Sequence, residues 1–308
     1  MTEQASGYAS GRYIASLSAF GRPRELPLAG GWILERDIPG FDARDAMSAY
    51  PLLVARDWSK LSEDLATVGA GLVSLVVVTD PLGVYDERLL CDCFPDRVLP
   101  FKEHYVVDLA VRRADWIAPH HRRNARRALA RVRVEVCADP VAALDEWVRL
   151  YGLLTRRHAI RGLAAFSAEA FALQLRTPGV VVLRAEAEGE TVGMLLWYLR
   201  GDLAYYHLGA YTTKGYDSGA SFALFHHALE YFAARGIRLL DLGGAAGTRV
   251  SKDDGLARFK RGWANAVRVA YLCGRVFDRD RYEELIDVTN TRSFEEHYFP
   301  AYRARERR

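Results

Sequence analysis

The sequence is poor in the residues that build metal sites and disulfides. Its 308 residues include only four cysteines: Cys91, Cys93, Cys137 and Cys273. A single residue separates Cys91 from Cys93, which is too tight for the usual structural zinc loop, and no His-rich segment lies nearby. We therefore expect no metal site and interpret the cysteines as buried or incidental thiols.

Long apolar runs are also missing. The sequence has no stretch of about 18 apolar residues, so we expect no membrane span. Residues 1–24 are polar and glycine-rich, and they lack the apolar core of a secretory signal peptide. A cytoplasmic location is the simplest expectation.

The net charge is small. The 42 basic and 39 acidic residues give a formal charge of +3. This balance does not indicate a nucleic-acid binder, although a local basic surface acts through its own field. Half of the residues are apolar and 11% are aromatic, which is enough for a substantial core and argues against disorder. The length fits two medium domains or one large domain.

The order of apolar and turn residues predicts an α/β (α+β) protein with mixed sheets flanked by helices. Residues 1–28 are expected to form a loosely ordered lead-in, because five of them are glycine or proline. Residues 29–114 predict a mixed α/β layer with a buried central strand over 71–79. Residues 115–308 predict a second, better formed module.

The second module is organised around residues 202–263. The pattern predicts an aromatic strand, a glycine-bearing turn, a helix, a buried strand and a final segment, at residues 204–210, 214–219, 220–234, 237–242 and 255–263. Residues 179–186 and 191–198 predict a hairpin before them. A strand, a turn that directs backbone amides at an anion, a helix and a second strand together form a ligand-binding crossover.

Two basic clusters precede this region. Pro119 suits the start of a helix, and residues 120–131 after it contain five arginines and two histidines. Residues 155–162 form the second cluster, at the end of a long predicted helix. One interpretation is a solvated helix face. The other is a patch for a phosphate-bearing substrate, because guanidinium groups match phosphate geometry.

Four segments of the second module form an ordered set. They are residues 121–128 (HRRNARRA), the basic cluster at 155–157, residues 240–244 (LDLGG), and residues 255–263 with their Phe259-Lys260 pair. This set resembles the GNAT acyltransferase superfamily, and within it the Fem-like branch, which includes peptidoglycan-type aminoacyltransferases and CelD-like acetyltransferase domains. The resemblance is best over residues 115–275. It implies tandem GNAT-like modules, with a degenerate N-terminal module at 29–114 and the acyltransferase module at 115–308.

The resemblance also implies a carrier pyrophosphate bound by backbone amides between a splayed strand and the following helix, where the helix dipole favours anions. In this sequence that place is residues 212–220. The family's Arg or Gln is replaced here by Tyr216, so the family pattern is only partly kept. An alternative is a hairpin-like turn that needs glycine for its backbone. The candidate cofactor-binding residues are Lys214, Gly215, Ser218, Gly219 and Ala220.

Four residues are candidates for the chemistry. In Fem-like enzymes the lysine of the matching Phe-Lys pair lies at the reacting centre, so the resemblance implies that Lys260 stabilises the developing oxyanion or the carrier's phosphate. The alternative is an exposed lysine on a short basic helix. A base must take the proton of an amine nucleophile, for which His207 and Asp241 are candidates. Tyr206 can protonate a thiolate leaving group. Tyr206 and His207 face opposite sides of their strand, so only one can line the cleft; His207 also fits a core histidine.

The candidate substrate-binding residues come from the two basic clusters and from the end of the second module's last segment. They are Arg123, Arg127, Arg157, Arg161, Phe259 and Trp263.

These observations favour an acyltransferase that moves an acyl group directly from acyl-CoA to an amine of a small-molecule or peptide acceptor. No nucleophile elbow or Cys–His pair indicates a covalent enzyme intermediate, and acyl-CoA is a co-substrate, with no permanently bound cofactor expected. Two alternatives stay open. One is a Fem-like aminoacyltransferase that uses aminoacyl-tRNA, whose acceptor stem would suit the arginine clusters. The other is a non-catalytic GNAT-fold binding module. The sequence predicts no oligomeric state.

Overall fold

The computed structural model describes residues 5–112, 116–245, 254–294 and 296–306. The chain folds into two compact units. Unit 1 consists of Met1–Gly7 and Lys102–Val269, and unit 2 consists of Tyr8–Phe101 and Ala270–Arg308. Strands β5 (Arg97–Asp108) and β11 (Ala266–Val276) each continue from one unit into the other.

The predicted boundaries at residues 28 and 114 do not coincide with these units. The expected lead-in contains helix α1 (Gly11–Ala15) and strand β1 (Arg22–Leu26), so much of it is regular structure. The last 39 residues, Ala270–Arg308, fold with the N-terminal segment rather than with the predicted second module.

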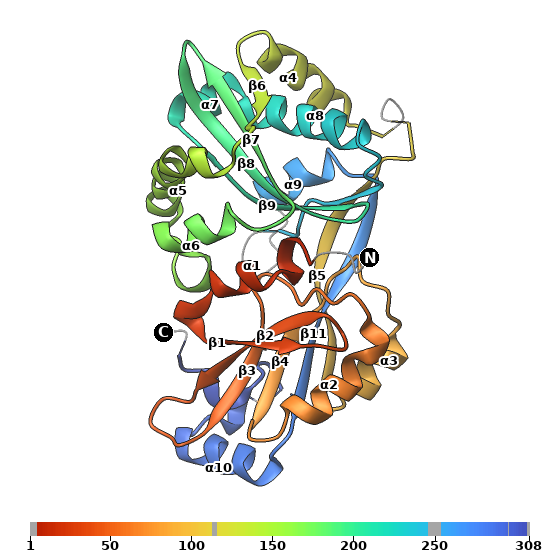
Figure 1. Cartoon of the computed structure of the whole chain (residues 1–308), viewed down its shortest axis with the longest axis vertical. Helices are drawn as coiled ribbons and strands as arrows, with labels where there is room; N and C mark the ends of the chain where they lie inside the picture. The colour runs from red at the N-terminus through yellow and green to blue at the C-terminus, as the bar shows by residue number, and fades with distance from the viewer. Residues whose placement is uncertain (1–4, 113–115, 246–253, 295, 307–308) are drawn as a thin grey trace. The chain divides into compact units, whose positions relative to one another are not determined.

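Unit 1 is built on a mixed sheet (Figure 1). Its strand order is β5-β10-β9-β8-β7-β6, in which β9 and β10 are parallel and all other neighbours are antiparallel. The strands after β5 are β6 (Arg133–Val136), β7 (Val180–Ala187), β8 (Glu190–Arg200), β9 (Leu203–Tyr211) and β10 (Leu239–Asp241). The hairpin between β7 and β8 is confirmed. Its two loop residues, Glu188 and Gly189, both have positive φ, as the twist of a two-residue hairpin requires.

Helices pack on this sheet (Figure 1). Helix α4 (Pro119–Leu129) packs on α8 (Ala220–Ala233), which contacts β7 and β8. Helix α5 (Leu144–His158) contacts β8 and β9, and α6 (Ala168–Gln174) packs on α5. Helix α6 is capped by Ser167, whose hydroxyl accepts a hydrogen bond from the Ala170 amide.

The core of unit 1 explains why α8 forms. Phe225 and Phe232 on α8 pack against Trp197 of β8, and Leu240 of β10 belongs to the same buried cluster. The apolar face of α8 therefore holds this helix against the sheet. In the chain, α8 lies between β9 and β10.

The strands of unit 2 follow the order β1-β2-β3-β4-β11. In it β3 and β4 are parallel and the other neighbours are antiparallel. The further elements of unit 2 are β2 (Gly31–Asp37), β3 (Arg44–Ser48), β4 (Ser74–Val78), α2 (Leu61–Val68), α3 (Glu87–Cys93) and α10 (Arg279–Thr289). Ahead of α2, the Asp57 carboxylate caps a short 3-10 helix by accepting a hydrogen bond from the Ser59 amide.

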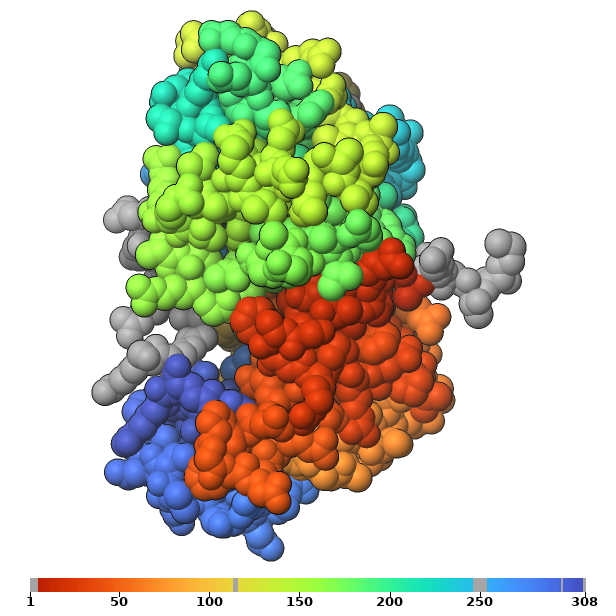
Figure 2. All heavy atoms as spheres, turned by 60° about the vertical axis from the view of Figure 1, so that its left-hand side comes forward, coloured from red at the N-terminus to blue at the C-terminus, as the bar shows by residue number. Residues whose placement is uncertain are grey.

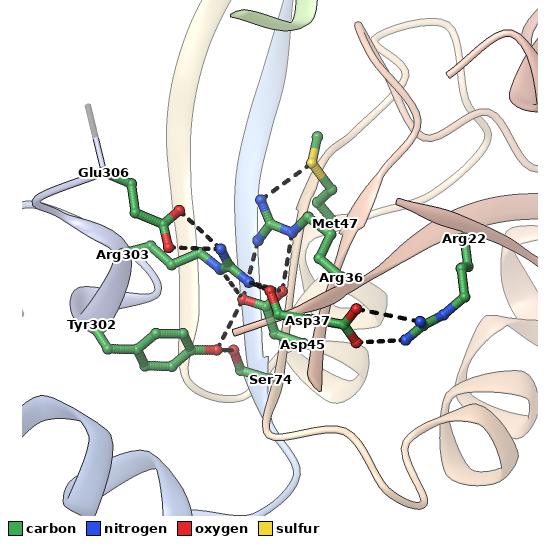
Figure 3. Close-up of polar contacts among 9 residues, drawn as sticks. All are labelled: Arg22, Arg36, Asp37, Asp45, Met47, Ser74, Tyr302, Arg303 and Glu306. Atoms are coloured by element: carbon green, nitrogen blue, oxygen red, sulfur yellow. Dashed lines mark hydrogen bonds and ion pairs between the residues drawn. The ribbon is translucent and has the colours of Figure 1, made fainter. Parts of the chain in front are cut away.

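A buried ionic network anchors the C-terminal segment to the sheet of unit 2 (Figure 3). Asp45 of β3 is completely buried and accepts hydrogen bonds from the guanidinium groups of Arg36 and Arg303. The Tyr302 hydroxyl also lies 3.0 Å from Asp45 and 2.8 Å from the Ser74 hydroxyl. These contacts give the physical reason why residues near 300 belong with strands near 45.

The cysteines lie apart from the helices and strands of the predicted crossover. Cys93 and Cys273 are buried in unit 2, Cys91 is exposed and Cys137 is half-buried, and all four thiols are free. Burial raises the pKa of Cys137 to about 11. In the part of the chain that the structure describes, no helix combines the length and apolar character needed to span a membrane.

Candidate active site

The site is built where strands β9 and β10 separate. Strand β10 pairs with β9 only over Leu203, Ala204 and Tyr205, whereas β9 continues to Tyr211 along β8. After Asp241 the chain turns away at Gly243, which has a φ of 75° in the left-handed region that glycine adopts readily. Beyond Tyr205, the edge of β9 that faces β10 therefore has no strand partner among the described residues.

Lys260 lies at this separation. It is on helix α9 (Gly255–Arg261), which begins at Asp254, whose carboxylate accepts from the amides of Leu256 and Ala257. The Lys260 side chain is only 6% exposed, and its Nζ donates a hydrogen bond to the Gly244 carbonyl at 2.7 Å. The alternative of an exposed lysine on a basic helix is wrong for Lys260, although it describes its neighbours Arg258 and Arg261, which are exposed.

Burial changes the charge state of this lysine. Desolvation lowers the pKa of Lys260 to about 8; the carboxylate of Asp241 opposes this effect and the ammonium of Lys102 adds to it. A Cβ on Gly243 would lie 3.1 Å from Lys260 Nζ, so the glycine lets the ammonium approach the backbone. The result is a cation that is held in place and poorly solvated.

His121 of α4 holds α9 in position. Its Nε2 donates to the Phe259 carbonyl at 2.9 Å, and its ring lies 5.0 Å from the Trp263 ring. Burial lowers the pKa of His121 to about 4, so the ring is neutral at pH 7. A Cβ on Gly262 would overlap this ring, which explains why glycine is required there.

Trp263 and Phe259 serve this packing. Trp263, a predicted substrate-binding residue, is completely buried in the core of unit 1, where its ring stacks on Phe225. This burial leaves the Trp263 side chain no surface for a substrate, so its observed role is to pack α9 against α8. Phe259 is half-buried, with its ring 5.0 Å from the Phe225 ring.

Asp241 is paired with a residue that sequence reasoning missed. The Asp241 carboxylate is 3% exposed and accepts from the Gly243 amide at 2.7 Å and from His104 Nδ1 at 2.9 Å. In the antiparallel pair of β5 and β10, Asp241 stands opposite Val106, so His104 is its diagonal neighbour on the same face. Local sequence patterns do not reveal that β5, which contains His104, pairs with β10.

Tyr206 and His207 point to opposite faces of the sheet, as predicted. The Tyr206 ring packs against Phe225 and lies 5.6 Å from Lys260 Nζ. His207 packs against Tyr198, and its Nε2 lies 3.2 Å from the Gln174 side-chain oxygen. The structure thus brings Tyr206 and Asp241 toward Lys260 and leaves His207 on the other face, in the role of a core histidine. Burial lowers the pKa of His207 to about 3 and raises that of Tyr206.

The predicted carrier site has a different local structure from the glycine turn that the sequence suggested. Residues Thr213–Ser218 form a short helix, α7, because the Thr212 hydroxyl accepts from the Gly215 amide and caps it. Lys214 is paired with Glu188 at 2.7 Å, so its charge is largely offset. Helix α8 begins after Gly219 without a side-chain cap, and the amides of Phe222 and Ala223 bond to the Gly219 carbonyl. The positive end of the helix dipole favours an anion at this place.

Arginines lie on both sides of the segment that joins α7 to α8. On α4, Ala128 is 3.4 Å from the position of a Cβ on Gly219, and its sequence neighbour Arg127 is exposed. From α5, the Arg157 guanidinium lies 4.3 Å from the centroid of the Tyr216 ring. The yellow and yellow-green atoms of the α4–α5 region cover much of the surface of unit 1 seen in Figure 2.

The remaining predicted arginines are also exposed. Arg123 lies on α4 and Arg161 follows the end of α5. Among the described residues, no carboxylate forms an ion pair with Arg123, Arg127, Arg157 or Arg161. Their charge is therefore available to an anion. Ser218 is half-buried and its hydroxyl donates to the Gly215 carbonyl, while Ala220 is completely buried.

Comparison with known proteins agrees with this arrangement. Residues 119–261, from the first residue of α4 to the last residue of α9, match the model of the acetyltransferase (GNAT) domain. The whole chain is similar in structure to FemX, with a TM-score of 0.67 and 12% identity over 89% of this chain and 93% of that one. No curated protein sequence matches this chain.

Two further solved structures share the fold. One is the C-terminal domain of a putative lysylphosphatidylglycerol synthetase from Agrobacterium fabrum, with a TM-score of 0.61 and 16% identity over 90% of this chain and 91% of that one. The other is L-PGS from Bacillus licheniformis, with a TM-score of 0.60 and 18% identity over 94% and 98%. The match of residues 119–261 to the GNAT acetyltransferase domain supports an acyltransferase, and the chain shares the fold of FemX.

Proposed function

We propose that the GNAT domain transfers an acyl group from acyl-CoA to a primary amine of a small-molecule or peptide acceptor. The observation that carries the proposal is the desolvated ammonium of Lys260, held at the separation of β9 and β10 by the Gly244 carbonyl. Such a cation stabilises an oxyanion on the acyl carbonyl far better than it would in water. With a pKa of about 8, Lys260 is mostly protonated at pH 7.

The reaction is a direct displacement on the thioester. The amine nitrogen attacks the acyl carbonyl and forms the C–N bond, and the C–S bond then breaks with its electron pair leaving on sulfur. The amine proton passes to a base, and the thiolate takes a proton from an acid. Tyr206 suits the acid: its ring is next to Lys260, and burial raises its pKa, so the phenol keeps its proton.

The start of α8 supports a pyrophosphate-bearing donor. This helix has 14 residues and no side-chain cap. The exposed Arg127 lies on α4, which packs on α8, and the Arg157 guanidinium lies over the ring of Tyr216 on α7. A helix N-terminus with adjacent guanidinium groups binds phosphate through amides, dipole and charge together. The single pyrophosphate of CoA would fit one such site at the start of α8.

The alternative donor is aminoacyl-tRNA. It is favoured by the exposed arginines that extend along α4 and beyond α5, over more surface than one pyrophosphate needs. The fold shared with FemX and with lysylphosphatidylglycerol synthetase is consistent with this alternative.

Calorimetry separates the two donors. We expect CoA to bind, and charge reversal at Arg127 and Arg157 to weaken that binding by roughly 1.5–3 kcal/mol for each lost charged hydrogen bond. The matched control is Arg235→Glu, an exposed arginine beyond the other end of α8, which leaves CoA binding unchanged. Aminoacyl-tRNA is titrated at about 50 mM and at about 200 mM salt. If the protein contacts several phosphates of the tRNA, its affinity for tRNA should fall by about 10³ or more between the two salt concentrations. CoA binding that is absent, with tight and salt-sensitive tRNA binding, overturns the choice of donor.

A further inference from the structure

A buried polar pair, His104 and Asp241, lies where β5 pairs with β10 in unit 1. Both are nearly inaccessible, at 6% and 3% exposure, and a buried polar pair of this kind costs desolvation free energy. The pair lies beside Gly243 and Gly244, where Lys260 is also bound.

The geometry assigns the proton on the histidine. A carboxylate only accepts hydrogen bonds, so the nitrogen that faces Asp241, Nδ1, carries the hydrogen when the ring is neutral. The lone pair is then on Nε2. The described residues offer Nε2 no hydrogen-bond partner, and 8% of the His104 side chain is exposed to solvent.

We infer that His104 is the general base of the proposed acyl transfer and that Asp241 is the residue that positions it; the inference rests on the proposed function. Nε2 takes the proton of the attacking amine as the C–N bond forms, and the ring becomes an imidazolium. The Asp241 carboxylate stabilises that cation and keeps Nε2 as the basic nitrogen. The imidazolium then returns its proton to solvent.

The other histidines of unit 1 near this region do not fit the role. His207 lies on the opposite face and bonds to Gln174, and His121 uses Nε2 to hold the Phe259 carbonyl. Asp241 alone is a weaker candidate, because its two oxygens already accept from Gly243 and His104. The charged groups around the pair are those of Lys102, Lys260 and Asp254, which influence one another's protonation.

The first test is His104→Asn, since the asparagine amide can still donate to Asp241 but has no basic nitrogen. The assay follows thiol release from acetyl-CoA with a panel of primary amines. We expect kcat to fall by about 10²–10⁴ while KM changes by less than about threefold. His226→Asn, on α8, is the matched control and keeps wild-type kcat. Hydroxylamine, a weakly basic amine that loses its proton more easily, should restore much of the lost rate.

The second test uses the wild type and Asp241→Asn. Nitrogen-15 NMR should show His104 protonated on Nδ1 in the wild type. In Asp241→Asn the asparagine amide donates to Nδ1, so the proton moves to Nε2 and kcat falls as in His104→Asn, although the fold is retained.

Three outcomes overturn the inference. One is a His104→Asn variant with kcat within about threefold of the wild type, well short of the loss expected for a general base. Another is wild-type His104 protonated on Nε2, a result that needs no variant to fold. The third is a loss of kcat in His207→Asn but not in His104→Asn. Wild-type enzyme that releases no thiol with any donor instead overturns the proposed function, and the inference with it.

Discussion

Lys260 should titrate about two pH units below an ordinary lysine. Its pKa is lowered from 10.5 to about 8, chiefly because burial removes the ammonium from water. At about 1.4 kcal/mol per pH unit, this difference corresponds to roughly 3 kcal/mol of unfavourable charge burial at neutral pH. The unfolded chain binds the proton more tightly than the folded protein, so stability rises as the pH increases from about 8 to about 10.5.

The perturbation is Lys260→Met, which keeps the length of the side chain and removes its charge. The sequence has only five lysines, so carbon-13 labelling of Cε gives a spectrum in which the missing signal assigns Lys260. We expect its midpoint near pH 8, while Lys214, which is paired with Glu188, serves as the control and titrates above 10.5.

Stability gives the second readout of this prediction. From pH 7 to pH 10.5 the wild type should gain up to about 3 kcal/mol relative to Lys260→Met in urea unfolding. A Lys260 midpoint near 10.5, or a difference between the two proteins that does not change with pH, refutes the reasoning that this ammonium is desolvated.

Three further predictions follow from the packing. Gly262→Ala overlaps the His121 ring and should destabilise unit 1 by about 1–3 kcal/mol in urea unfolding. Gly255→Ala, at the open end of the same helix, should leave the stability unchanged. Equal effects of the two substitutions contradict the tight contact between Gly262 and His121. Asp45→Ala leaves buried guanidinium groups without their partner and should cost about 3–5 kcal/mol in unit 2; a loss below about 1 kcal/mol argues against the network. The low pKa of His207, about 3, means that the unfolded chain binds the proton more readily, so stability falls as the pH drops from about 6.5 toward 3. His207→Gln should reduce this acid sensitivity in thermal unfolding; an unchanged pH profile contradicts it.

Local sequence patterns were sufficient to predict most of the helices and strands. The hairpin of β7 and β8 was predictable because Glu188 and Gly189 supply the turn, and α6 because Ser167 caps it. The start of α4 at Pro119 was equally readable. In each case the residues that decide the structure lie within a few positions of one another.

Features that depend on distant pairing were not predictable. His104 and Asp241 are 137 residues apart, and they meet only because β5 pairs with β10. Arg303 and Asp45, 258 residues apart, decide that the C-terminal segment folds with unit 2. Lys260 and the Phe259-Lys260 pair were found through a family resemblance, but the burial of Lys260 follows from its bond to Gly244, which periodicity does not reveal.

The predicted glycine turn failed for a local reason. The Thr212 hydroxyl accepts a hydrogen bond from the Gly215 amide and so caps the six-residue helix α7. The glycine content had suggested an irregular loop at this place. Helices this short are governed by single caps, which outweigh the propensities of their residues.

One measurement tests the central claim most directly: thiol release from acetyl-CoA with a panel of primary amines, by the wild type and by Lys260→Met. We expect turnover by the wild type, and a kcat lower by about 10²–10³ in a folded variant that still binds CoA, because one oxyanion-stabilising group has been removed. Equal turnover by the two proteins would contradict the role of Lys260. No turnover by the wild type with any amine, from acetyl-CoA or from aminoacyl-tRNA, would contradict the proposed function itself.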